Sequence, residues 1–124
     1  MTDAPGTPRE SPEVFIVLDA LDVEKVAAFW VEALAYRRVD RLDQYVVLVP
    51  LEGATGSVFL VQGVPESKAA KNRMHLDLHV SDPEAEAQRL VALGATRTGV
   101  GALGEISWIT MTDPEGNEFD IGQR

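Results

Sequence analysis

The chain has 124 residues, of which 45% are hydrophobic and 25% are charged, with no cysteine and a net charge of −9. This size and composition predict one globular domain without disulfides, thiolate metal sites or a cysteine nucleophile. The 11 basic residues stand against 20 acidic ones and form no basic block, so we expect no nucleic-acid partner. No segment resembles a signal peptide or a bilayer span, and the absence of cysteine is typical of a reducing compartment, so we expect a cytoplasmic protein with no membrane partner.

The first half of the chain has the pattern of a strand, a helix and three more strands. Residues 1–13 carry three prolines and few apolar side chains, which predicts a disordered N-terminal tail before a single domain at 14–124. A β-rich run predicts a strand at 14–20, and Asp22 is a typical N-cap for the helix after it. The apolar face of that helix is predicted to comprise Val23, Val26, Ala27, Trp30 and Leu34. The three further strands are predicted at 36–42, 45–51 and 57–62.

A polar linker at 63–73 leads into a second half with the same order of elements. Its first strand is predicted at 74–80, and Asp82 then serves as N-cap, with Pro83 in the first helical position. The inward face of this helix is predicted to comprise Ala87, Leu90, Val91 and Leu93.

The last part of the second half contains three predicted strands and several glycines. A short strand is predicted near 95–98, followed by a loose connection that contains Gly99, Gly101 and Gly104. The final two strands are predicted at 105–111 and 117–122, joined by a turn at 113–116.

The two halves are copies of one unit, with modules at 14–62 and 74–122. A shift of 60 residues brings Phe15 onto His75, and matching residues follow at the same shift. These matches include Leu18/Leu78, Asp22/Asp82, Glu24/Glu84, Ala27/Ala87, Gly56/Gly116 and Phe59/Phe119, with Arg38/Arg97 at a shift of 59. The repeat predicts an α+β fold in which two βαβββ modules form a cupped mixed sheet. We expect positions that agree to serve the fold, while positions that differ are free to form a site.

Strand alternation assigns a polar face to the second module. The residues opposite its helix side are His75, Asp77, His79, Glu118 and Asp120, which include both histidines of the chain. The matching face of the first strand carries Phe15, Val17 and Asp19. Imidazole and carboxylate groups on one concave surface predict a ligand or metal site. The alternative is a solvated face whose acids pair with one another or with an arginine such as Arg73, Arg89 or Arg97.

Two segments in the second half carry a family resemblance. The repeated βαβββ unit, the segment KNRMHLDLHVSDPEAEAQRLVALGA and the ending DPEGNEFDI resemble the glyoxalase/bleomycin-resistance/dioxygenase (vicinal oxygen chelate) superfamily. The best match is its glyoxalase-like branch, which is common in actinobacteria, and the likeness covers about Val14 to Ile121. The resemblance implies a cup that receives a small-molecule ligand, and assembly as a homodimer.

The resemblance also implies which positions could hold a divalent metal. Superfamily enzymes take ligands from the first and last strands of a module, and these positions fall on His75 and Asp120 in the second module. In the first module they fall on Phe15 and Leu60, which cannot ligate a metal. Asp77 or His79 would have to supply a third ligand. The favoured interpretation is therefore a cup without metal, and the alternative is a bound Zn, Ni, Mn or Fe ion.

Three functional hypotheses follow. The first is a small-molecule binder of the sequestering or resistance type, whose acidic charge would attract a cationic ligand. Its ligand-binding residues would be Phe15, Val17, Leu60, Asp77, Trp108 and Tyr45. The second is a metal-dependent lyase or isomerase of the glyoxalase type, with His75 and Asp120 as metal ligands and Glu118 or His79 as general base. The third is a non-catalytic module that dimerises through exposed strand edges.

Overall fold

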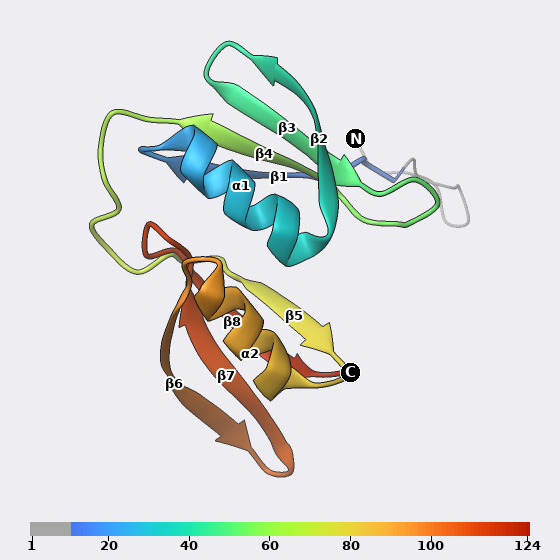
Figure 1. Ribbon diagram of the computed structural model, residues 1–124, viewed down its shortest axis with the longest axis vertical. Coiled ribbons are helices and arrows are strands. Elements are labelled where there is room, and N and C mark those ends of the chain that lie inside the picture. Colours follow the sequence, from blue (N-terminus) through green and yellow to red (C-terminus); the bar gives the residue numbers. More distant parts are fainter. Residues whose placement is uncertain (1–10) are drawn as a thin grey trace, which may run out of the picture.

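The described part of the chain, residues 11–124 of a computed structural model, folds into two modules with the same order of elements (Figure 1). The first module comprises β1 (Phe15–Ala20), α1 (Val23–Leu34), β2 (Tyr36–Leu42), β3 (Tyr45–Pro50) and β4 (Val58–Gly63). The second comprises β5 (Leu76–Val80), α2 (Pro83–Ala92), β6 (Thr96–Leu103), β7 (Ile106–Thr112) and β8 (Glu118–Gln123). The prediction of two βαβββ modules in an α+β fold is confirmed. Most of the predicted tail at 1–13 lies outside the described residues.

Each module forms its own four-stranded mixed sheet. The strand order is β1-β4-β3-β2 in the first, named sheet A, and β5-β8-β7-β6 in the second, named sheet B. The first and last strands of each module pair in parallel with the same register, so that Ile16 lies opposite Phe59 and Leu76 lies opposite Phe119. One helix covers one face of each sheet, on the viewer's side in Figure 1, and the other face of each sheet stays uncovered.

Both helices begin at an aspartate, because its side chain satisfies a backbone N–H that no helical carbonyl can reach. Asp22 accepts a hydrogen bond of 3.2 Å and Asp82 one of 3.1 Å, each from the backbone N–H three residues later. Pro83 occupies the first helical position, where its missing N–H costs nothing. Gly94 follows α2 with a φ of 114°, which glycine adopts without strain. Neither helix of the described residues is long and apolar enough to cross a membrane.

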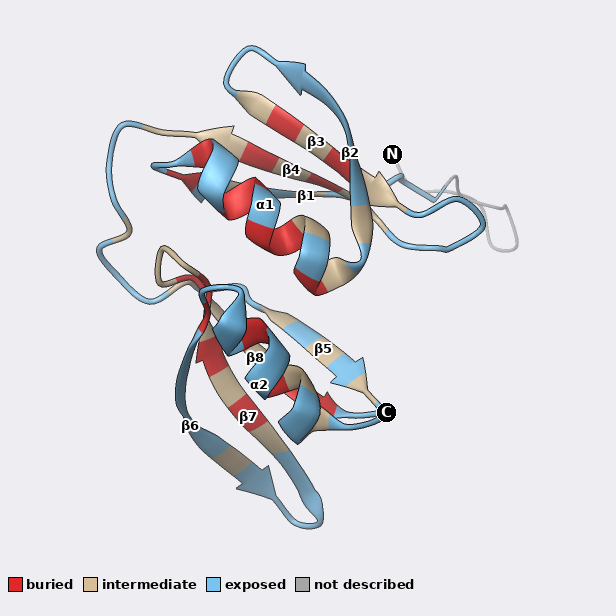
Figure 2. Cartoon of the chain, viewed as in Figure 1, coloured by how far each residue is buried: buried red, intermediate tan, exposed pale blue. Residues whose placement is uncertain are grey.

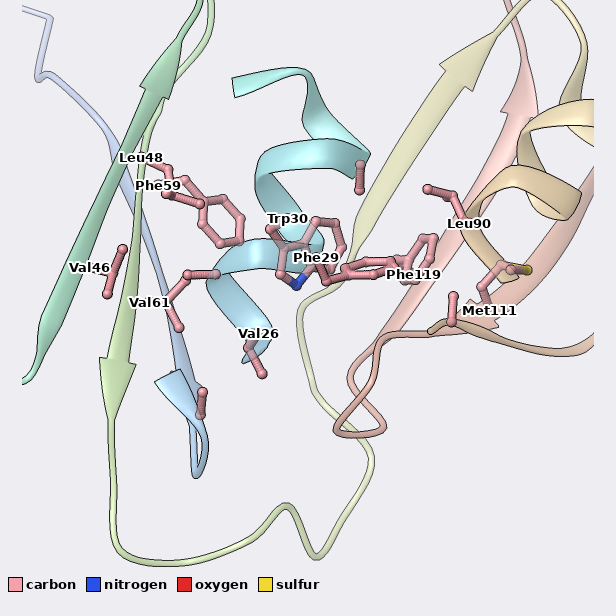
Figure 3. Close-up of a cluster of buried hydrophobic side chains, with 14 of the residues drawn as sticks. Val26, Phe29, Trp30, Val46, Leu48, Phe59, Val61, Leu90, Met111 and Phe119 are labelled. Atoms are coloured by element: carbon pink, nitrogen blue, oxygen red, sulfur yellow. The ribbon is translucent and has the colours of Figure 1, made fainter. Parts of the chain in front are cut away.

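Trp30 of α1 lies at the centre of the core that joins the two modules (Figure 3). Its ring centroid lies 5.6 Å from that of Phe59 in sheet A and 5.2 Å from that of Phe119 in sheet B. All three rings are buried, and buried residues alternate with less buried ones along the central strands, as strand geometry requires (Figure 2). The two repeated phenylalanines therefore share one aromatic partner, which makes α1 a common support for both sheets.

A turn of the second module, residues 113–117, holds the first module by hydrogen bonds and is named the turn clasp. Its buried Asp113 accepts a bond of 2.9 Å from Nε1 of Trp30, and it also accepts from two backbone N–H groups within the turn. Glu115 accepts from the backbone N–H groups of the two residues that precede α1, at 2.8 and 2.6 Å. The aromatic contact and the turn clasp join the modules, and Arg89 of α2 adds hydrogen bonds of 3.3 Å to the backbone oxygen of Glu32 in α1.

The predicted inward face of the second helix is partly wrong. Helix α2 buries Ala87 and Leu90, whereas Val91 is 46% exposed and Leu93 is 38% exposed. The apolar stripe is narrower than predicted because the helix is short, and Leu93 is already its C-cap.

The prediction that glycines loosen the chain after residue 98 is also wrong. Gly99 and Gly101 lie inside β6, which pairs with β7 along its length, with a register shift between Arg97 and Gly99. A strand ladder is made by backbone groups, which glycine supplies like any other residue. At Gly101 the missing side chain also makes room for Trp108, as described below.

Candidate functional site

A groove of about 670 Å³ lies on the uncovered face of sheet B. Its titratable and aromatic lining residues are His75, Asp77, His79, Glu105, Trp108 and Asp120, and Gly122 also lines it. All residues that line it belong to the second module. The structure therefore brings four of the five predicted polar residues together on one sheet rather than in a hollow shared by both, whereas Glu118 lines a different hollow.

The centre of the groove is a group formed by His75, Asp77 and Asp120. Nε2 of His75 lies 3.1 Å from Oδ1 of Asp77 and 3.3 Å from Oδ2 of Asp120. The two aspartates come together because β5 and β8 are parallel neighbours and Asp77 is paired with Asp120 in the ladder. The imidazole thus contacts two carboxylates at once, and a ligand cation would meet the same two acids.

His79 lies two residues beyond Asp77, on the same face of β5. Its Nδ1 contacts the backbone oxygen of Gln123 at 3.3 Å. A carbonyl oxygen only accepts, so this contact places the proton on Nδ1 and leaves Nε2 as a free acceptor. His79 is therefore suited to take a proton from a bound molecule.

Glu118 is held by the linker between the modules. Its two carboxylate oxygens accept from Nζ of Lys68 at 2.8 Å and from the backbone N–H of Asn72 at 3.1 Å. Partial burial opposes its ionisation, but these hydrogen bonds outweigh burial and lower the pKa of Glu118 to about 2. A carboxylate with so low a pKa is a weak base near neutral pH, so its surroundings favour a structural role over the predicted catalytic one.

The predicted arginine partners do not neutralise the groove. Arg97 pairs with Glu84 at 2.6 Å, and Arg89 pairs with Glu86 at 2.7 Å. These carboxylates belong to α2, on the opposite face of sheet B. The negative charge of Asp77 and Asp120 is therefore answered only by His75 among the described ion pairs.

None of the ligand residues predicted in the first module lines the groove. Phe15 and Val17 line a second hollow of about 380 Å³, which also touches His75. Leu60 and Tyr45 line neither hollow and lie on the inner strands of sheet A. Trp108 does line the groove, as the sequence predicts.

The group at the centre of the groove fits a divalent transition metal. One ligand atom each from His75, Asp77 and Asp120 lies within 4.8 Å of the others. Bonds of roughly 2.1 Å in a tetrahedral site set neighbouring ligand atoms roughly 3.4 Å apart. The distances from Nε2 of His75 to Asp77 and Asp120, 3.1 and 3.3 Å, are close to this value. Imidazole and carboxylate ligands suit Zn, Fe, Ni or Mn. Asp77, rather than His79, completes the set.

The residues that escaped prediction are Glu105, Ile106, Ser107, Gly122 and Gln123 in the lining of the groove, Gly101 beside it, and Lys68, which binds Glu118. Gly101 and Gly122 were not predicted as site residues because a glycine carries no functional group, and because Gly101 was assigned to a loose connection rather than to a strand beside Trp108. Lys68 lies in a linker without a repeat counterpart, so nothing in the pattern connects it to Glu118.

The fold with two paired modules is shared with proteins of known structure. A fosfomycin resistance protein from Listeria monocytogenes aligns with a TM-score of 0.74 at 16% identity, covering 94% of this chain and 95% of that one. A bleomycin-binding protein from Streptomyces verticillus, solved with copper(II)-bleomycin, aligns with a TM-score of 0.64 at 17% identity, covering 94% and 99%. A lactoylglutathione lyase from Agrobacterium tumefaciens gives 0.65 at 18% identity, covering 94% and 96%. At these identities the likeness establishes the fold alone.

The family follows from the sequence itself. Residues 15–122 match the profile of the glyoxalase-like domain, and the chain belongs to that family. This match confirms the glyoxalase-like branch that the resemblance implied. A search among curated proteins gave no significant match.

Proposed function

We propose that the protein binds a small cationic molecule in the sheet B groove and acts as a sequestering or resistance-type binder in the cytoplasm. The observation that carries the proposal is the pair Asp77 and Asp120, which lie side by side with only His75 between them. A positively charged group would gain two charge-assisted hydrogen bonds there. The net charge of −9 would attract such a ligand over a longer range.

The names of the structural neighbours support this proposal. One is a bleomycin-binding protein, another is a fosfomycin resistance protein and a third is a lactoylglutathione lyase, so proteins of this fold include binding and resistance proteins as well as an enzyme. We propose the same broad use for this chain, with the ligand chosen by the residues of its own groove.

Calorimetric titration of the metal-free protein with bleomycin and with a panel of amine metabolites tests the proposal. We expect saturable binding of at least one cation, weakened roughly tenfold by Asp120→Asn, because a hydrogen bond to a charged group contributes about 1.5–3 kcal/mol. Asp19→Asn is the matched control, since it removes an exposed acid from the strand of sheet A that corresponds to β5, and it should change the affinity less than twofold. Binding that appears only after a metal is added would contradict a metal-free binder.

A second candidate is a metal-dependent lyase or isomerase, supported by the three ligand atoms that lie within 4.8 Å of one another. A divalent ion bound there would polarise a substrate oxygen. His79, with Nε2 free, would serve as general base, whereas the low pKa of Glu118 argues against that residue. Elemental analysis after incubation with Zn, Ni, Mn and Fe separates the candidates: stoichiometric uptake that Asp77→Asn abolishes would favour the enzyme, and no uptake would remove it.

We further propose that the protein is a homodimer. Phe15 and Val17 on the uncovered face of sheet A are 49% and 50% exposed, and β1 and β5 each end a sheet with an open edge. Exposed apolar side chains beside open strand edges favour contact with a second copy. Sedimentation velocity at micromolar concentration should give a dimer, and Val17→Lys should shift it toward monomer; a monomeric parent protein would contradict the proposal.

A further inference from the structure

A row of four paired residues crosses the uncovered face of sheet B. His79 of β5 lies opposite Gly122 of β8, Gly122 lies opposite Trp108 of β7, and Trp108 lies opposite Gly101 of β6. Ring side chains and glycines therefore alternate along the row. Since neighbouring strands lie about 4.8 Å apart, the backbones of the two ring-bearing residues are separated by roughly 10 Å, with only a glycine between them.

Gly101 allows Trp108 to lie away from the middle of this row. A Cβ added at Gly101 would fall 2.2 Å from Cε2 and 2.3 Å from Nε1 of the Trp108 indole, and both distances are shorter than non-bonded contacts of a Cβ atom. The indole therefore covers the Gly101 backbone, and Gly101 is the one residue of β6 that is not exposed. A side chain at this position would push the indole back toward Gly122 and into the groove.

On the other side of the Trp108 backbone, the imidazole of His79 lies over Gly122, which is buried. A Cβ added at Gly122 would lie 3.4 Å from Cε1 of the imidazole, an ordinary van der Waals contact. Asp77 and Asp120 lie one pair further along the same two strands, on the same face of the sheet. Two rings, the imidazole over Gly122 and the indole over Gly101, thus lie on either side of the Trp108 backbone and adjoin two carboxylates.

We propose that this row, named the ring slot, receives a flat ring of the ligand, whose cationic group contacts Asp77 and Asp120, and that Gly101 sets the width of the slot. The inference rests on the proposed small-molecule binding in the groove and narrows its ligand to cations that carry an aromatic ring. A ring beside Trp108 gains stacking, and a cation near the indole face gains electrostatic attraction.

The corresponding row in sheet A supports the assignment. It consists of Asp19, Gln62, Tyr45 and Leu42, paired in the same order across β1, β4, β3 and β2. Gln62 and Leu42 stand where sheet B has its two glycines. Sheet A therefore keeps an aromatic residue in the row but fills both spaces beside it, and the slot is specific to the second module.

The experiment follows the two tryptophan indole N–H signals of the ¹⁵N-labelled protein by NMR, with Trp108→Phe used to assign them. The probes are benzylammonium, which has a flat ring, and cyclohexylmethylammonium, which has the same charge and a puckered ring. We expect both amines to shift the Trp108 signal and leave the Trp30 signal in place, with benzylammonium bound about fivefold more tightly, as expected for one aromatic contact. Gly101→Ala should shift the Trp108 signal without ligand and weaken benzylammonium about tenfold, since overpacking displaces the indole.

Gly99→Ala is the matched control, because Gly99 lies on the same strand and an added Cβ would meet only the Thr110 hydroxyl, at 3.3 Å. It should change both affinities less than twofold. Equal affinity for the two amines, or a Gly101→Ala variant that binds like the parent, would overturn the ring slot while leaving cation binding intact. If neither amine shifts the Trp108 signal, the ring slot is rejected, and the broader proposal then depends on the calorimetric panel alone.

Discussion

The two modules agree on one side of their sheets and differ on the other. Their helix sides match in detail: both helices have an aspartate N-cap, and both last strands place a buried phenylalanine against Trp30. Their uncovered faces carry different chemistry at matched positions. The differing pairs are Phe15/His75, Val17/Asp77, Leu60/Asp120 and Gln62/Gly122.

The two modules also share an ion pair at equivalent positions on their surfaces. Arg38 contacts Glu24 at 2.6 Å in the first module, and Arg97 contacts Glu84 at 2.6 Å in the second. Each pair ties the second strand of a module to its helix. The difference between the faces therefore teaches that the repeated unit keeps its own scaffold and that only the uncovered face of the second copy has polar site chemistry.

The turn clasp is the feature in which the second module differs most from the first. Its removal should lower the free energy of unfolding more than any other change proposed below. Asp113→Ala removes a buried carboxylate that accepts hydrogen bonds from the Trp30 indole N–H and from two backbone N–H groups of the turn. These donors then lack their acceptor. We expect a loss of about 3 kcal/mol in the free energy of unfolding, measured by urea denaturation. Glu52→Ala, in the exposed loop of the first module, should cost less than about 0.5 kcal/mol. Equal losses would contradict the clasp.

The repeated phenylalanines test whether the modules depend equally on Trp30. Phe59→Leu and Phe119→Leu each remove a fully buried ring that lies 5.6 or 5.2 Å from the Trp30 ring. We expect each to lower the free energy of unfolding by about 1–2 kcal/mol, with the two values within about 0.5 kcal/mol of each other. Thermal unfolding by circular dichroism provides the measurement, and a threefold disparity would indicate that one sheet dominates the core.

The N-caps offer a milder comparison. Asp22→Ala and Asp82→Ala each remove one side-chain acceptor from the first turn of a helix, so each should cost about 1 kcal/mol. Asn at either position keeps an acceptor and should restore most of the loss, which serves as the control. Chemical denaturation of the four variants provides the measurement. An Asp82→Ala variant with the free energy of unfolding of the parent protein would contradict equal roles for the two N-caps.

Substitution of Glu118 should have the smallest effect on the free energy of unfolding. The effect is specific to the second module, because the equivalent residue of the first module is Val58. The hydrogen bonds from Lys68 and Asn72 lower the pKa of Glu118 to about 2 in the folded chain, against an ordinary value of 4.5. Its contribution is therefore fully present above pH 4.5 and is lost as the pH falls toward 2. We expect Glu118→Gln to lose about 1 kcal/mol at pH 7, a value reduced by solvent screening, and to differ less from the parent below pH 4.5. Urea denaturation across this pH range provides the measurement, and a difference that does not change with pH would exclude the ionised carboxylate as its source.

The repeat predicted much of the fold, because matched residues at a fixed shift reveal the unit in the sequence alone. It also placed His75, Asp77, His79 and Asp120 on one face, since strand alternation is fixed by backbone geometry. The position of Tyr45 and Leu60 relative to the groove was not predictable, because alternation assigns a face but not the mutual placement of two sheets. The contact between Trp30 and Asp113 spans the two modules, so no local pattern could reveal it.

The bond from Trp30 to Asp113 has a consequence for how the chain is made. Its two partners lie 83 residues apart, so a nascent chain that has released only its first module from the ribosome has no acceptor for the indole N–H and no Phe119 ring beside it. That half therefore emerges with an unfinished aromatic surface. It gains these contacts only after residues 113–119 have emerged, and an aromatic surface that stays exposed until then is prone to misassociation.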